Sequence, residues 1–501
     1  MTSEPYIIVH PPDDRGLREV TTLERTLGRA FSARDLHRLL HRAGFSGEID
    51  IEDPTRVHWS GGDSSVWPDH RWRRRSVAAA MTVGLLINAS VFAKIGVKDV
   101  FRALSYGGRV TGVSFLAAAL VQLVALLSIL DYWRKRNLRY SGAAVLIGVI
   151  ATLVLNSLML FVHIYGGEYT IYLWLWPTLL IWSFWALWEL FRQGVWGQIP
   201  HLKGITAGVT ASGLLAAVNL AYTQVYLPYA HTVPFPLEVK FGKPSLSSDG
   251  TALNLPIHMH YENSAKVRIY VLDAIWHIYG GSTKFVSGAR SMKDWKADLM
   301  QGSDFRRNFE ERDWDLIDFG GLAGVGDWLE PGGKYNHERL VQLPANANFD
   351  IISARIEFMI VRADRGTLDW RFTDSRELSW DPEADNFDHK EDAPEWVAGV
   401  DDEYIKYHSR IYYSNEILNV TRRPQYVTLW QVIPDFSHRS PPEQDDTDPY
   451  MMSIIAPAGR ENKYNVPDQQ KVSERFGLSS VHSDSAAQAS FESLLQTAKR
   501  N

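Results

Sequence analysis

The chain has 501 residues, with 52 Lys and Arg, 58 Asp and Glu, and no cysteine, so its formal net charge at pH 7 is -6. This length allows about three domains. The absence of cysteine excludes disulfides, cysteine-ligated zinc, iron–sulfur clusters and cysteine nucleophiles.

Charge is distributed unevenly along the chain. Residues 1–75 contain equal numbers of basic and acidic residues, whereas residues 231–501 contain 30 basic and 42 acidic residues. An acidic surface argues against a nucleic-acid partner, because phosphate binding requires clustered Lys and Arg. A large acidic domain without disulfides is typical of a bacterial protein.

Residues 1–70 are predicted to form a small cytoplasmic α+β module. Short strands are expected at 6–9, 18–23 and 56–60. Between them, Ser32 with Asp35 resembles a helix-capping arrangement, and Gly44 stands where a helix C-cap belongs. We therefore expect one amphipathic helix in this module.

Residues 71–230 are predicted to form a five-helix transmembrane bundle. Apolar segments of about 20 residues can cross the hydrocarbon core of a bilayer as helices. Five segments have this character, and the first is the shortest: 76–93, 111–130, 141–163, 171–191 and 204–226. The loop after the first segment is basic and is expected to form a short helix on the membrane surface.

The basic residues between these segments predict an orientation. Arg71 to Arg75 precede the first segment, and Arg134 to Arg139 lie between the second and third, where Lys and Arg mark the inner side. The loop between the third and fourth segments, around Glu168, has no Lys or Arg. The pattern favours a cell-membrane protein with a cytoplasmic N-terminus and an extracytoplasmic C-terminal domain.

The fourth segment, IYLWLWPTLLIWSFWALWELF, is rich in tryptophan. At 100° per residue, four of its tryptophans share one helix face, to which Glu189 also belongs. This aromatic face indicates contact with lipid, or alternatively a groove that receives a ligand or another helix. The four residues are Trp174, Trp182, Trp185 and Trp188.

The fifth segment carries a stripe of small residues, which is typical of closely packed helices. The stripe predicts either packing within the chain or self-association through this span, and it consists of Gly204, Gly208, Ser212 and Ala216. The segments contain a few polar residues such as Asn88, Gln122 and Asn156, interpreted as interhelical hydrogen-bonding groups. Ionisable groups are missing from the middle of the segments, which argues against a coupled transporter.

Residues 231–435 are predicted to form an extracytoplasmic, mainly β domain that resembles a β-sandwich. In LNLPIHMHYE, alternate residues from Leu253 to Tyr261 are apolar, as in a half-buried strand. Residues 352–360 show a second alternation, and 426–433 adds another apolar strand. Repeated alternating strands separated by turn residues are typical of a sandwich.

Two groups of residues in this domain are candidate metal ligands. His258, His260 and Glu262 lie on one face of the predicted strand, within reach of one metal ion, and the default interpretation of these residues is a solvated outer face. The acidic loop DPEADNFDHKED offers Asp381, Glu383, Asp385 and Asp388 as calcium ligands. It lacks the glycine of an EF-hand, so a solvated acidic loop is the alternative.

Residues 436–501 are predicted to be a polar tail that ends in a short helix, whose apolar face contains Phe491 and Leu494. The sequence contains no recognisable nucleophile, phosphate-binding or dinucleotide motif, so no catalytic residue or cofactor is predicted. The predicted function is that of an envelope scaffold or sensor, with the lipid bilayer and a protein as partners. The alternatives are a membrane-bound enzyme that acts on lipid-linked or cell-wall substrates, and a channel or transporter.

Overall fold

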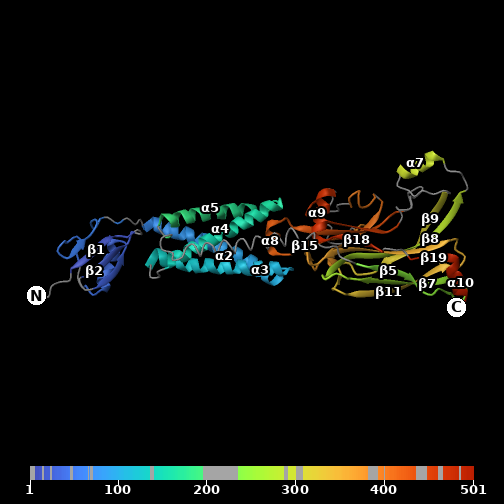
Figure 1. Cartoon of the computed structure of the whole chain (residues 1–501), viewed down its shortest axis with the longest axis horizontal. Helices are drawn as coiled ribbons and strands as arrows, with labels where there is room; N and C mark the ends of the chain where they lie inside the picture. The colour runs from blue at the N-terminus through green and yellow to red at the C-terminus, as the bar shows by residue number, and fades with distance from the viewer. Residues whose placement is uncertain are drawn as a thin grey trace. The chain divides into compact units, whose positions relative to one another are not determined.

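The structure is a computed structural model of the whole chain. It describes residues 6–13, 16–22, 25–45, 49–65, 67, 71–135, 140–193, 195, 235–286, 291–300, 309–381, 393–399, 401–435, 448–460, 466–483 and 487–500. The chain divides into two compact units (Figure 1). The first comprises Met1–Arg102, Arg109–Leu220 and Val420–Arg422, and the second comprises Ala103–Gly108, Ala221–Asn419 and Arg423–Asn501.

The N-terminal part of the first unit is a small α+β fold, as the sequence predicts. Its four-stranded sheet has the order β3-β2-β1-β4, and β1 and β4 are parallel. Helix α1 (Ala33–Arg42) starts where Ser32 Oγ accepts a hydrogen bond from the amide of Asp35, which confirms the predicted cap. The strands are β1 (Ile7–Pro12), β2 (Arg18–Thr22), β3 (Thr26–Ala30) and β4 (Val57–Trp59).

Three helical segments among the described residues are long and apolar enough to cross a membrane: Arg74–Arg102, Tyr106–Trp133 and Ser141–Gly166. They belong to α2 (Arg71–Arg102), to α3 (Tyr106–Leu130) with the π-helical turn η1 (Asp131–Lys135), and to α4 (Ser141–Gly166). Helix α2 continues without interruption to Arg102. The prediction of a separate surface helix after the first span is therefore wrong.

The expected five spans are not supported. Segment 171–191 does form a helix, α5 (Tyr172–Arg192), but α5 is not among the three helices that qualify by length and composition. Its five tryptophans, Pro177 and Glu189 lower its average hydropathy below that of α3 and α4. The fifth segment, 204–226, lies outside the described residues.

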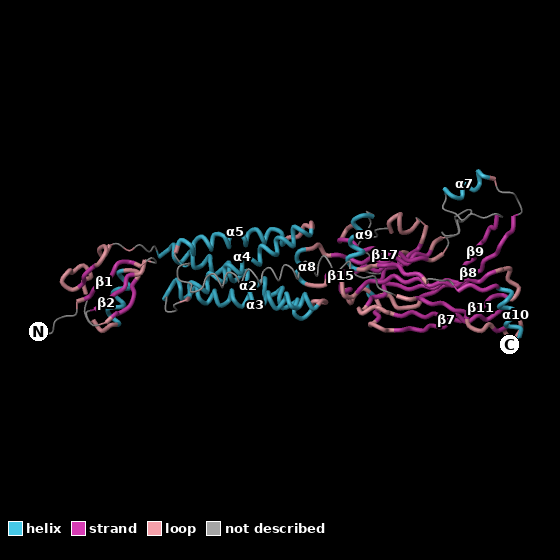
Figure 2. Tube along the Cα trace, viewed as in Figure 1, coloured by secondary structure: helices cyan, strands magenta, loops and turns pink. Residues whose placement is uncertain are grey.

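The second unit is mainly β, and Figure 2 shows its strands in magenta. Its central sheet has the strand order β10-β8-β12-β18, with β9 on β8 and β19 on β12, and every pairing is antiparallel. The strands are β8 (Ile269–Val286), β9 (Phe309–Gly321), β10 (Trp328–Leu329), β12 (Ile351–Arg362), β18 (Ser479–His482) and β19 (Ala487–Ser490). Between β8 and β9 lies the short helix α7 (Met292–Met300).

Two further antiparallel sheets pack on the central sheet. The first outer sheet has the order β11-β7-β5, with β6 also on β7, and consists of β5 (Leu237–Phe241), β6 (Ser245–Leu246), β7 (Ala252–Glu262) and β11 (Lys334–Pro344). The second outer sheet has the order β13-β15-β16-β17, with β14 also on β15. Its strands are β13 (Gly366–Leu368), β14 (Arg376–Leu378), β15 (Glu403–Tyr413), β16 (Gln425–Ile433) and β17 (Tyr450–Pro457).

Side-chain alternation divides the apolar residues of the central sheet between two cores. Ile356 and Phe358 of β12 pack in a core with residues of the first outer sheet, whereas Met359 and Val361 pack in a core with residues of the second outer sheet. The central sheet is therefore covered on both faces, which explains why β8 and β12 are apolar on both sides.

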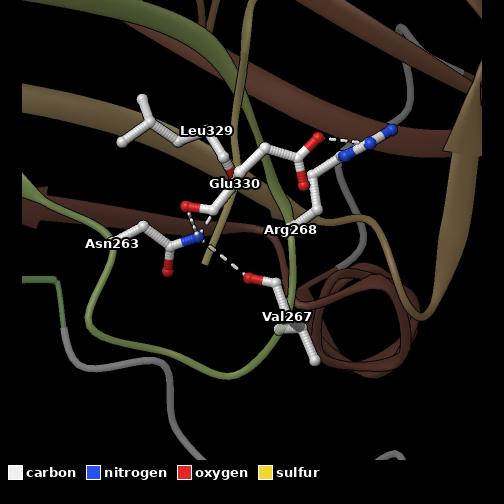
Figure 3. Close-up of polar contacts among 5 residues, drawn as sticks. All are labelled: Asn263, Val267, Arg268, Leu329 and Glu330. Carbon is white, nitrogen blue, oxygen red and sulfur yellow. Dashed lines mark hydrogen bonds and ion pairs between the residues drawn. The ribbon is translucent and has the colours of Figure 1, made fainter. Parts of the chain in front are cut away.

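A buried asparagine holds the connection that follows β7 (Figure 3). Asn263 is fully buried, and its Nδ2 donates to the carbonyls of Val267 at 2.9 Å, Leu329 at 3.0 Å and Glu330 at 3.2 Å. Arg268 forms an ion pair with Glu330 nearby. The two hydrogens of this amide are thus shared among three backbone acceptors, and they tie the β7–β8 connection to the end of β10.

The C-terminal region is more structured than the sequence predicts. The expected polar tail contains β17, α9 (Val466–Phe476), β18, β19 and α10 (Phe491–Arg500), and these strands complete two of the sheets. Phe491, Leu494 and Ala498 of α10 are buried in the core of the first outer sheet, so the apolar face predicted for the last helix docks on this unit. Strands β18 and β19 are only four residues long, too short to be recognised by alternation.

Candidate functional site

The four tryptophans of the predicted aromatic face have different environments. Trp174 and Trp188 are mostly exposed, with 66% and 58% of their surface accessible, whereas Trp182 and Trp185 pack against the buried residues of the helix bundle. Trp176, on the other side of α5, is fully buried. The exposed pair is thus available to lipid or to a partner, while the other two contribute to helix packing.

Trp182 is fixed by a glycine on α2. A Cβ atom on Gly84 would lie 1.9 Å from the indole ring of Trp182, so only glycine leaves room for the ring. The indole Nε1 donates to the carbonyl of Ala80 at 3.1 Å. A large side chain on α5 therefore fills the space that a small residue leaves on α2.

Polar side chains within the apolar helices hydrogen bond to one another, as interpreted from the sequence. Asn156 Nδ2 of α4 donates to Asn88 Oδ1 of α2 at 2.8 Å, and Gln122 Nε2 of α3 donates to Thr152 Oγ1 of α4 at 2.9 Å. All four residues are fully buried. These bonds join α2 and α3 to α4, and they give the polar groups a structural role.

The predicted ligands His258, His260 and Glu262 all lie on the outward face of β7, and each has a neighbour on β11. His258 Nδ1 is 3.7 Å from Glu338, His260 Nδ1 is 2.8 Å from Asn336 Oδ1, and Glu262 is 2.9 Å from Lys334 Nζ. Among the described residues, no group of three or more His, Asp or Glu is arranged to hold a metal ion. The metal site on this strand stays a prediction.

Two other predicted sites fall largely or wholly outside the described residues. Of the candidate calcium ligands only Asp381 is described, and Glu383, Asp385 and Asp388 are not. The small-residue stripe is not described either; it comprises Gly204, Gly208, Ser212 and Ala216.

The structure brings together a set of polar side chains that the sequence did not single out. They lie on the face of the central sheet that turns away from the first outer sheet, and we call this set the polar face. It consists of Asp273, His277 and Tyr279 of β8, Arg355 and Glu357 of β12, and Ser480 and His482 of β18.

Asp273 is the most deeply buried acid of the polar face. Only 2% of its surface is exposed, its Oδ1 accepts from the amide of Ala274, and its Oδ2 accepts from Gln431 Nε2 on β16, both at 2.8 Å. Burial disfavours the charged carboxylate and raises the pKa of Asp273 to about 6, although the two hydrogen bonds oppose this shift. Asp273 therefore titrates close to neutral pH.

His277 and Tyr279 are covered by the segment that enters β17. His277 Nε2 is 2.8 Å from the carbonyl of Pro449, so Nε2 carries the proton and donates. Tyr279 stacks on His277, and its hydroxyl donates to the carboxylate of Asp448. Burial lowers the pKa of His277 and raises the pKa of Tyr279, which keeps both rings neutral.

Asp273 and His277 do not form a catalytic pair. They are four residues apart on one strand, a separation of about 13 Å, so no proton can pass directly between them. Arg355 lies opposite His277 in the register, and its guanidinium carbon is 4.6 Å from the centre of the Tyr279 ring. His277 and Tyr279 thus hold the segment around Pro449 in place, and they do not position a reacting group.

Ser480, His482 and Glu357 form a second cluster at the exposed end of the polar face. Ser480 Oγ lies 3.2 Å from His482 Nε2, and His482 Nδ1 lies 3.7 Å from Glu357 Oε1. The serine hydroxyl donates to Glu357 at 2.9 Å, and the imidazole is 64% exposed. A serine nucleophile needs its proton directed at the histidine and the histidine held by the acid, and this geometry provides neither.

Comparison with known proteins gives matches only among solved structures. No protein-family model and no curated protein matches the sequence. A structural genomics target, SoR45, aligns with 26% of this chain and 74% of its own, at 8% identity and a TM-score of 0.15. Spo0M, a sporulation control protein from Bacillus subtilis, aligns with 48% of this chain and 95% of its own, at 6% identity and a TM-score of 0.16. Scores this low carry no argument about fold or function.

Proposed function

We propose that the chain is a membrane-anchored scaffold or sensor of the bacterial cell envelope, which binds its partner through the mainly β unit. The observation that carries the proposal is the use of polar groups in the helices. Asn88, Gln122 and Asn156 are buried and hydrogen bonded to neighbouring helices. This use is typical of a packed anchor, because groups that carry a solute face a path through the membrane.

The ionisable groups of these helices support the same proposal. Asp99 is buried but lies only three residues before the end of α2. Glu189 is buried near the end of α5, where it accepts from Gln193 at 2.9 Å and lies 3.8 Å from Arg192. Both groups thus lie near helix ends, whereas proton and ion relays place ionisable groups at mid-membrane.

The proposed orientation has the N-terminal module in the cytoplasm and the mainly β unit outside. Because the chain has no cysteine, single cysteines report one position each. Arg42→Cys on α1 and Lys293→Cys on α7 both replace exposed residues. In intact cells, a membrane-impermeant maleimide should label the second variant only, whereas both should react after lysis. Protection of Lys293→Cys until lysis would refute an outer β unit.

The binding role is tested by removing the β unit. Crosslinked partners of the full chain should be lost when residues 235–501 are deleted, provided that the shortened chain still reaches the membrane. Retention of every partner would contradict the proposal.

The two alternatives have their own assays. A metalloenzyme predicts bound metal in the purified chain and loss of activity when His258 and His260 are replaced together. A channel or transporter predicts solute flux in reconstituted vesicles.

A further inference from the structure

Strand β11 presents a long unpaired edge. It pairs with β7 over all eleven residues from Lys334 to Pro344 without a register shift, and β7 pairs with β5 and β6 on its other side. Among the described strands β11 has no second neighbour, and residues 334–340 are all exposed except His337. A regular edge of this length is a template for another strand.

The hydrogen bonds that flank the ladder define which backbone groups point outward. The amide of Asn263 donates to the carbonyl of Gly333 at 3.0 Å, and the amide of Ala345 donates to the carbonyl of Thr251 at 2.9 Å. Both pairs continue the β7–β11 register. Because hydrogen-bonded and non-hydrogen-bonded pairs alternate in an antiparallel ladder, the odd-numbered residues of β11 bond to β7. The even-numbered residues, from Lys334 to Gln342, direct their N–H and C=O groups to the open edge.

We propose that two copies of this chain pair through β11 as antiparallel strands, with the two-fold axis at Asn336. The side chains decide this register. With the axis at Asn336, residues 334–338 of the two strands lie opposite each other. Lys334 then faces the partner's Glu338, and this pair occurs twice. An axis at His337 would place Lys334 opposite a leucine, and an axis at Glu338 would place two like charges opposite each other.

The paired edges extend a charge pattern that already exists within each copy. Lys334 Nζ is 2.9 Å from Glu262, and Glu338 is 3.7 Å from His258 Nδ1. Across the four strands at the centre of the dimer, the outer face presents in order Glu262, Lys334, the partner's Glu338 and the partner's His258. Neighbouring charges in this row alternate in sign. On the opposite face, Tyr335 lies beside the partner's His337 and covers a ring that is 48% exposed in the single chain.

Charged residues on an edge strand commonly prevent association, and this is the competing interpretation of Lys334, Glu338 and Arg339. Self-complementarity about one axis distinguishes the two interpretations, because protective charges have no reason to match across a two-fold axis. The dimer goes beyond the proposed function and does not depend on it, and it uses a surface other than the fifth apolar segment.

The register is tested by cysteine crosslinking of the detergent-solubilised full chain. Asn336→Cys should form a disulfide-linked dimer on mild oxidation, because the two copies of residue 336 face each other across the axis. Gln342→Cys, on the same edge and face, is the control: its two copies would be about 40 Å apart in this register. Absence of a crosslink at 336, or equal crosslinking at both positions, would overturn the proposal.

Two proline variants separate dimer formation from folding. Asn336→Pro removes an N–H that points outward and leaves the β7 ladder intact, so it should raise the dimer dissociation constant at least tenfold with little change in melting temperature. His337→Pro removes an N–H bonded to β7 and should lower the melting temperature. Light scattering in detergent measures the mass of each variant. A monomeric native chain, or a dimer that Asn336→Pro leaves intact, would refute pairing through β11.

Discussion

Replacement of Asp273 by asparagine should remove a pH dependence from the stability of the mainly β unit. In the native chain the carboxyl is 2% exposed and titrates near pH 6, against 3.8 for an unperturbed aspartate. The folded state therefore binds the proton more tightly than the unfolded state. The contribution of Asp273 to the free energy of unfolding therefore falls as pH rises from 3.8 to about 6, and this contribution is level above that range.

The size of the effect follows from the shift. A pKa raised from 3.8 to about 6 corresponds to ~3 kcal/mol, because a tenfold change in proton affinity is worth about 1.4 kcal/mol. Asparagine has nearly the same shape and cannot ionise, and Gln431 can turn its amide to keep a hydrogen bond with it. Relative to the native chain, Asp273→Asn should thus gain most of this energy, ~2.5 kcal/mol, between pH 4 and pH 7.

Hydrogen exchange measures this difference in the full chain. Protection of amides in β8 and β16 is compared between the native chain and Asp273→Asn at pH 4, 5, 6 and 7. Intrinsic exchange rates cancel at each pH, as do the contributions of all other titrating groups. The ratio of protection factors should change by about a hundredfold in favour of the variant as pH rises. A ratio that is constant over this range would refute the assigned burial of the charge.

Three further outcomes are expected. Replacement of His277 by glutamine should raise stability relative to the native chain below pH 6.5, since burial lowers the pKa of His277 and protonation of the unfolded native chain then favours unfolding. Hydrogen exchange in β8 at pH 5 and pH 7 checks this. An equal ratio of variant to native protection factors at the two pH values would contradict it. Gly84→Ala should destabilise the helix bundle by more than about 1 kcal/mol because the new Cβ meets the Trp182 ring, and adding Trp182→Ala should recover part of the loss. Unfolding of the single and double variants in detergent measures both effects. Equal stability of Gly84→Ala and the native chain would argue against this packing. Asn88→Leu should lower stability by about 1 kcal/mol in the same assay, because it leaves Asn156 Nδ2 without its acceptor. The double variant Asn88→Leu with Asn156→Leu should lose less stability than the single variant. A larger loss in the double variant would show that the Asn88–Asn156 hydrogen bond does not explain the effect.

Local patterns in the sequence predicted those parts of the chain whose burial follows a regular period. The cap at Ser32 and the apolar segments 111–130 and 141–163 correspond to α1, α3 and α4. The alternation from Leu253 to Tyr261 corresponds to β7, with its apolar residues in the core. Segment 171–191 is helical as expected. Its tryptophans do not reveal from the sequence which of them face lipid, because tryptophan suits both a membrane interface and a packed interior.

The polar face was not predictable, because an irregularity in β8 decides it. Val271 and Ala274 both face the core shared with the first outer sheet. Leu272 and Asp273, which lie between them, therefore both face the second outer sheet. This bulge breaks the alternation from which the orientation of Asp273 would be inferred. The partners of Asp273 and His277 are Gln431 and Pro449, more than 150 residues further along the chain.

The sequence by itself thus determined the longer periodic helices and strands, their apolar faces and the absence of cysteine chemistry. Only the tertiary structure decided what lies against each face or edge: Gly84 under Trp182, the segment that enters β17 over His277, and no described strand other than β7 beside β11. The physical reason is that hydrophobic periodicity reports whether a side chain leaves water. It contains no information about which distant segment replaces that water.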